Sequence, residues 1–185
     1  MQPKLKRKMA KSKIADLKKI LDEMTLDELK QEILKLYNKL PQVKDFYNQD
    51  LMTEEERQEV LNKFKEKIYK EFWTSKGNPK GMINNSTIKN TISDYEKICL
   101  FAFDLVDLLL YRVEIATEYA EQFGGMAESN YNASITTFKK AMKIIQENSF
   151  LSHFEIRIKI IFKANNLDYW YINQLEHLFE EITQN

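Results

Sequence analysis

Residues 98–123, ICLFAFDLVDLLLYRVEIATEYAEQF, form the longest apolar stretch of the chain and decide its fold class. Charged residues interrupt the stretch every two to five positions from residue 104 onward. Such a density of charge at the centre of a bilayer would cost several kcal/mol for each residue. The stretch therefore predicts a buried helix with one wet face and not a membrane span. The charged residues are Asp104, Asp107, Arg112, Glu114, Glu118 and Glu121.

The acidic residues of this stretch share one face of the predicted helix, because their steps of three, seven, four and three follow the helical repeat. This stripe consists of Asp104, Asp107, Glu114, Glu118 and Glu121. One interpretation is a metal or polyamine site. However, a ferritin-like di-iron site needs Glu-x-x-His on two helices, and neither His153 nor His177 has that spacing. We favour a solvated face, paired with Lys or Arg from a neighbouring helix.

Arg112 lies inside the apolar run. It is either a partly buried cation paired with a carboxylate, which would hold two helices in register, or a side chain whose stem reaches water. We favour the structural ion pair. Cys99 also lies among apolar residues, where a thiol is usually inert packing. The sequence carries neither His-Glu-x-x-His nor Gly-x-Ser-x-Gly, so we predict no catalytic, cofactor-binding or metal-binding residues.

Helical signals continue on both sides of the apolar stretch. Thr25 followed by Glu28, and Thr53 followed by Glu56, are typical of capped helix starts. Gly124 can supply the positive φ that ends a helix. Together these signals predict an all-α fold, an irregular antiparallel bundle or array of about seven to eight helices. We expect a flexible basic arm over residues 1–11 and a single helical domain over residues 12–185.

The composition narrows the class of protein further. The chain has 185 residues with 28 basic and 28 acidic side chains, four glycines and one cysteine. So few glycines argue against phosphate-binding loops and Rossmann turns. A single cysteine cannot form an internal disulfide, which favours a reducing, cytoplasmic location. The basic N-terminus has no apolar segment after it, so we expect no signal peptide.

Basic residues gather in the N-terminal arm and in the segment from residue 74 to residue 89, which contains the loop expected before the next helix. Lysines could contact phosphates there while Trp73 stacks on a base. The alternative is a frayed terminus and a solvated loop. The nucleic-acid hypothesis predicts salt-sensitive binding to single strands. The absence of a mobility shift at about 50 mM salt would refute it. Its candidate contacts are Lys4, Lys6, Arg7, Lys8, Trp73, Lys76, Lys80 and Lys89.

Three adjacent aromatic residues, Tyr169, Trp170 and Tyr171, open the last predicted helix. Neighbouring residues on a helix lie about 100° apart, so the three rings cannot all face one core. We expect at least one ring to be exposed, either as an interface anchor or as a lid over the preceding helix.

Several segments of the chain resemble a family of small, all-helical, uncharacterised bacterial proteins, a domain of unknown function frequent in Bacteroidetes. The resemblance covers most of residues 12–182. It implies a helical fold and a cytoplasmic bacterial origin, but no activity and no functional residues. The segments are 27–37 (DELKQEILKLY), 43–51 (VKDFYNQDL), 67–73 (KIYKEFW), 86–98 (STIKNTISDYEKI), 108–124 (LLLYRVEIATEYAEQFG) and 138–145 (FKKAMKII).

The sequence predicts a non-enzymatic helical scaffold or adaptor that binds a protein partner or associates with itself. We identify no combination of nucleophile, base and oxyanion-stabilising group that would indicate catalysis. Exposed aromatic residues and unevenly charged chain ends, in contrast, are available to contact a partner. A nucleic-acid-associated factor that uses the basic arm and the Lys76–Lys89 loop is the second hypothesis. An enzyme with an acidic metal site is the third.

Overall fold

The computed structural model describes residues 13–164 and 169–183, and its regular elements there are all helices. The all-α prediction is confirmed, although the described residues form nine helices and not seven or eight. The chain divides into two compact units, Met1–Tyr47 and Asn48–Asn185. The helices are α1 (Ile14–Asp22), α2 (Leu26–Lys39), α3 (Pro41–Leu51), α4 (Glu54–Phe72), α5 (Asn85–Ile98), α6 (Ala102–Phe123), α7 (Glu128–Glu147), α8 (Leu151–Ile161) and α9 (Tyr169–Thr183).

Both predicted capping boxes form and set the starts of α2 and α4. The Thr25 hydroxyl accepts from the Glu28 backbone N–H at 3.3 Å, and the Glu28 carboxylate accepts from the Thr25 N–H at 2.8 Å. Thr53 and Glu56 repeat this arrangement at α4. Each reciprocal pair satisfies two backbone N–H groups at a helix start, and removal of such a cap typically costs about 1 kcal/mol.

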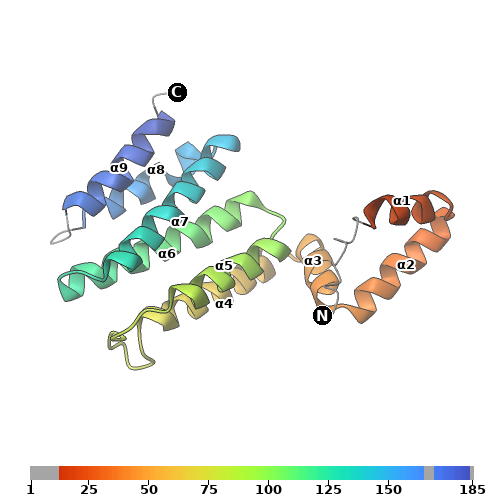
Figure 1. The fold of residues 1–185 in the computed structure, drawn as a ribbon, viewed down its shortest axis with the longest axis horizontal. Coiled ribbons are helices and arrows are strands. Elements are labelled where there is room, and N and C mark those ends of the chain that lie inside the picture. The colour runs from red at the N-terminus through yellow and green to blue at the C-terminus, as the bar shows by residue number, and fades with distance from the viewer. Residues whose placement is uncertain (1–12, 165–168, 184–185) are drawn as a thin grey trace, which may run out of the picture. The chain divides into compact units, whose positions relative to one another are not determined.

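In the second unit α4 packs against α5, α6 packs against α7, and α9 also packs against α7 (Figure 1). Helix α6 is central, because it packs against α4, α5, α7 and α8. Its side chains of Val106, Leu108, Leu110 and Val113 are fully buried. The apolar stretch that decides the fold class is therefore the centre of the core.

Helices α5 and α6 are separate, and the buried helix predicted over residues 98–123 begins only at Ala102. The backbone is extended at Cys99 and Phe101, so the helix ends at Ile98 and a new one begins at Ala102. The other end of α6 follows the prediction. Gly124 adopts φ +71°, a left-handed conformation that glycine reaches without a Cβ penalty.

The loop between α4 and α5 folds back on the end of α4. Trp73 and Pro79 form an isolated antiparallel bridge, and the Lys80 N–H donates to the Phe72 carbonyl at 2.8 Å. The Tyr119 hydroxyl of α6 donates to the Lys80 carbonyl at 2.8 Å. These bonds hold the loop against α4 and α6.

A membrane span is not found among the helices of the described residues, since none is both long enough and apolar enough to cross a bilayer.

Candidate functional site

The first unit exposes most of its large apolar side chains. Neither α1 nor α2 has a buried residue, and the exposed fractions of these side chains run from 36% to 68%. All the buried apolar residues of the described chain lie at Leu61 or beyond. The first unit therefore presents apolar faces without a core of its own. Its exposed apolar residues are Ile14, Leu17, Ile20, Leu21, Leu26, Ile33, Leu34, Leu36, Leu40, Phe46 and Tyr47.

The apolar residues of α2 follow a regular stripe, which we call the α2 stripe. It consists of Leu26, Leu29, Ile33, Leu36 and Leu40, the last at the helix C-cap. The steps alternate between three and four residues. This is the spacing of a helix that packs lengthwise against another helix, with side chains of one inserted between those of the other.

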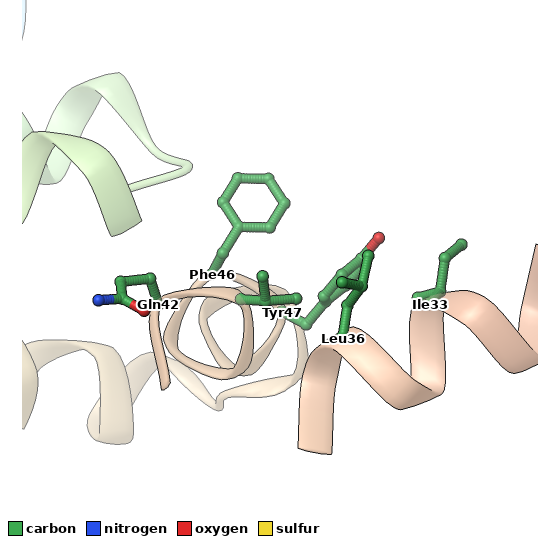
Figure 2. Close-up of a pocket in the computed structure, with 6 residues that line it drawn as sticks. Ile33, Leu36, Gln42, Phe46 and Tyr47 are labelled. Atoms are coloured by element: carbon green, nitrogen blue, oxygen red, sulfur yellow. The ribbon is translucent and has the colours of Figure 1, made fainter. Parts of the chain in front are cut away.

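A shallow groove of about 330 Å³ lies between α2 and α3. Figure 2 shows Ile33 and Leu36 of α2 and Phe46 of α3 pointing to the same side. Gln42, Val43 and Tyr47 complete the lining. Because the groove is almost wholly apolar, it is suited to an apolar side chain of another helix and offers little to a polar ligand.

The acidic stripe on α6 faces cations from two neighbouring helices. Arg57 of α4 donates to Asp104 at 3.0 Å, and Lys65 of α4 lies 2.8 Å from Asp107. Arg157 of α8 lies 2.5 Å from both Asp107 and Glu114. Glu118 is exposed and accepts a hydrogen bond from Gln122 at 3.2 Å, while Glu121 is half-buried.

The stripe is thus a set of interhelical ion pairs over much of its length. Among the described residues no group of His, Cys, Asp and Glu is arranged to hold a metal ion. Burial raises the pKa of Asp104, and the neighbouring Arg57 guanidinium opposes part of that rise. Burial opposes the charge of Arg157, but its bonds to Glu114 and the charge of Asp107 dominate and raise its pKa.

The predicted ion pair of Arg112 is wrong. The side chain is 1% exposed, and within the described part of the chain no carboxylate lies at ion-pair distance from it. Its Nη2 donates to Asn85 Oδ1 at 3.4 Å and to the Asn130 carbonyl at 3.5 Å, and its Nη1 has no hydrogen-bond partner. Burial lowers the pKa of Arg112 to about 10, so the group is still charged at neutral pH.

Trp73 does not fit the predicted role of a base-stacking residue. Its side chain is only 4% exposed and packs among Tyr69, Tyr119 and Phe123. A ring enclosed in this way cannot stack on a nucleotide. Of the predicted lysines, Lys76 and Lys89 are exposed and Lys80 is half-buried. Lys4, Lys6, Arg7 and Lys8 lie outside the described residues.

The aromatic triplet divides between surface and core. Tyr169 and Trp170 are exposed, as expected for interface candidates, but Tyr171 is fully buried and is wrong as an interface residue. The Tyr171 hydroxyl shares hydrogen bonds with Ser134 at 2.8 Å and Thr117 at 3.2 Å. The hydrogen bonds of Tyr171 therefore link α9 to α6 and α7.

Cys99 is half-buried, and its thiol donates to the Phe101 carbonyl at 3.1 Å. Burial raises the pKa of this thiol, which keeps it protonated and poorly nucleophilic at neutral pH.

Comparison with known protein families gives a match over most of the chain. The sequence model of a family of unknown function (DUF6155) matches residues 9–185. No curated protein and no solved structure matches the chain. The comparisons therefore supply no activity, substrate or ligand.

Proposed function

The chain belongs to this family of unknown function (DUF6155), and we propose that it is a non-enzymatic helical scaffold whose first unit associates with a second copy of the chain. The observation that carries the proposal is the α2 stripe, a regular apolar face on a unit with no buried side chain in α1 or α2. The contact would be made by the α2 stripes of both copies.

The short helices of the first unit gain stability from being covered. Helix α1 has nine residues and α2 has 14, lengths at which isolated helices are marginal in water. Covering the exposed part of each large apolar side chain would contribute on the order of 1 kcal/mol. Several such contributions from each copy are enough to order the unit and to hold two copies together.

Charge favours a second copy over a strongly charged partner. Helix α2 contains three acidic residues, Asp27, Glu28 and Glu32, and three basic residues, Lys30, Lys35 and Lys39. Its net charge is therefore zero, so two copies brought together do not repel each other. The alternating spacing of the α2 stripe is also self-complementary, as a two-fold symmetric contact requires.

The test is the mass of the full chain in solution, measured by light scattering and sedimentation up to about 100 µM. We expect a dimer for the natural protein. Ile33→Glu places a charge in the centre of the α2 stripe and is expected to give a monomer. Gln31→Glu adds the same charge on the opposite face of α2 and should leave the dimer intact.

Two results would overturn the proposal. The first is a natural protein that stays monomeric over the whole concentration range. The second is a dimer that Ile33→Glu and Gln31→Glu affect equally, because association would then use another surface. Circular dichroism checks that both variants keep the helical content of the natural protein.

We further propose that the protein acts in the cytoplasm of a bacterium. The single cysteine and the family resemblance of its segments support this location. The nucleic-acid hypothesis stays a prediction and rests on the basic residues alone, since Trp73 is buried.

A further inference from the structure

A second cavity, of about 400 Å³, lies among α5, α6 and α7 of the second unit. Its wall is partly apolar, formed by Ile88 and Ile92 of α5 and Leu109 of α6. Ser93 and Thr137 add hydroxyl groups, and Arg112 belongs to the same wall. A cavity of this size with an apolar wall and a few polar groups is typical of a small-molecule site.

Arg112 is an unusual residue to find in such a wall. It is almost completely buried, its Nη1 donates to nothing, and the two bonds of its Nη2 are long at 3.4 and 3.5 Å. Charge-assisted bonds to a carboxylate are usually about 2.7–2.9 Å. Asn85, which receives one of the long bonds, also lines the cavity, so the guanidinium lies beneath this part of the wall.

A buried cation without a counterion is costly, and proteins rarely keep one without a reason. The Phe72 ring lies 5.7 Å from the guanidinium Cζ and provides only a weak cation–π contact. The other ionic groups of the cavity lie toward its outside. Lys140 is bound to Glu96 at 2.6 Å, and Lys89 is exposed.

We propose that this cavity binds a small organic monocarboxylate, with its carboxylate against Arg112 and its apolar body against Ile88, Ile92 and Leu109. The planar guanidinium fits a carboxylate through two parallel hydrogen bonds, and its Nη1 makes no hydrogen bond within the described part of the protein. Because Arg112 is 1% exposed, Asn85 and other side chains of the wall move aside when the carboxylate binds. One buried positive charge is balanced by one negative charge. A phosphate ion would bring no apolar body for the wall formed by Ile88, Ile92 and Leu109.

The first test uses hexanoate as the probe and the full chain as the protein. Titration calorimetry and amide chemical shifts in NMR are expected to show saturable binding, with a Kd of about 1 mM and shifts at α5, α6 and α7. Hexanol has the same apolar body without the charge and should bind at least about tenfold more weakly. Inorganic phosphate should not saturate the site.

Two variants tie binding to the cavity. Arg112→Met removes the charge and should raise the Kd of hexanoate at least about tenfold. Ala133→Leu, on the cavity wall in α7, keeps Arg112 but fills the space and should have the same effect. Lys97→Met removes an exposed cation of α5 that pairs with Asp94, and binding should be unchanged.

Three outcomes would overturn the proposal. Hexanoate could fail to bind, or it could bind equally well to the Arg112→Met and Ala133→Leu proteins. Phosphate binding that is tighter than hexanoate binding would reject the monocarboxylate in favour of a different anion. If Arg112→Met does not fold, Ala133→Leu alone decides whether the probe occupies this cavity.

Discussion

Arg157 offers the sharpest test of how the helices of the second unit are held in register. It reaches from α8 to two carboxylates of α6, Asp107 and Glu114, at 2.5 Å each. The side chains of Arg157, Asp107 and Glu114 are 28%, 17% and 31% exposed. They therefore lie between surface pairs, which contribute 0 to about 1 kcal/mol, and buried pairs, whose disruption costs about 3–5 kcal/mol.

We expect Arg157→Met to lower the free energy of unfolding by about 2 kcal/mol. The value is below that of a buried pair for two reasons. Asp107 keeps Lys65 at 2.8 Å as a second partner, and Glu114 retains access to water. Methionine preserves much of the apolar stem of the arginine, so the loss reports mainly on the ion pairs.

Urea unfolding followed by circular dichroism measures this change, and Lys159→Met is the matched control. Lys159 is on the same helix, is 55% exposed and pairs with Glu155 four residues before it. Its loss should cost at most about 0.5 kcal/mol. Equal effects of the two substitutions, or a loss below about 0.5 kcal/mol for Arg157→Met, would refute the reasoning.

Three further predictions concern the core and the division into units. Arg112→Met, measured by thermal unfolding without ligand, should leave the free energy of unfolding unchanged or raise it by about 1–2 kcal/mol. The substitution removes a buried charge that has no carboxylate partner, and a loss above about 2 kcal/mol would contradict this prediction. Tyr171→Phe should cost about 1–2 kcal/mol at pH 7, because the hydroxyls of Ser134 and Thr117 lose their partner. Burial raises the pKa of Tyr171, so the folded state keeps a proton that the unfolded state releases near pH 10. Stability therefore falls as the pH rises above about 10, and urea titrations should show a smaller fall for Tyr171→Phe. A shortened chain of residues 48–185 should unfold cooperatively on heating, with nearly the melting temperature of the full chain. The reason is that all the described buried apolar residues lie within it. A non-cooperative transition would contradict this prediction.

Local signals predicted the helices well because their causes lie within a few residues. A capping box needs only a hydroxyl and a carboxylate three positions apart, as at Thr25 and Glu28. A left-handed helix end needs a glycine, as at Gly124. The break at Cys99 was harder to predict, because the residues on both sides of it are apolar and compatible with one continuous helix.

Site residues were harder to predict, because their roles depend on what lies across the fold. Trp73 follows a charged helix and precedes a lysine-containing loop, yet the returning loop and α6 enclose its ring. Arg112 has carboxylates near it in the sequence, but Asp107 and Glu114 bind Arg157. Spacing along one helix could not show which cation a carboxylate would meet.

The partners of the acidic stripe nevertheless left a signal in the sequence. Arg157 lies three residues after Phe154 and four before Ile161, and Lys65 lies four residues after Leu61. All three apolar residues are buried. A cation with core residues one helical turn both before and after it, such as Arg157, lies on the buried side of its helix, where a carboxylate stabilises it.

The same kind of apolar stripe has two different outcomes in this chain. In α4, Leu61, Ile68 and Phe72 are buried against the rest of the second unit. In α2, the equally regular stripe around Ile33 has no buried member. Periodicity therefore predicts that a helix face is to be covered, but not by which surface. For α2 the covering surface we propose is the α2 of another copy, and the Ile33→Glu and Gln31→Glu pair tests that step directly.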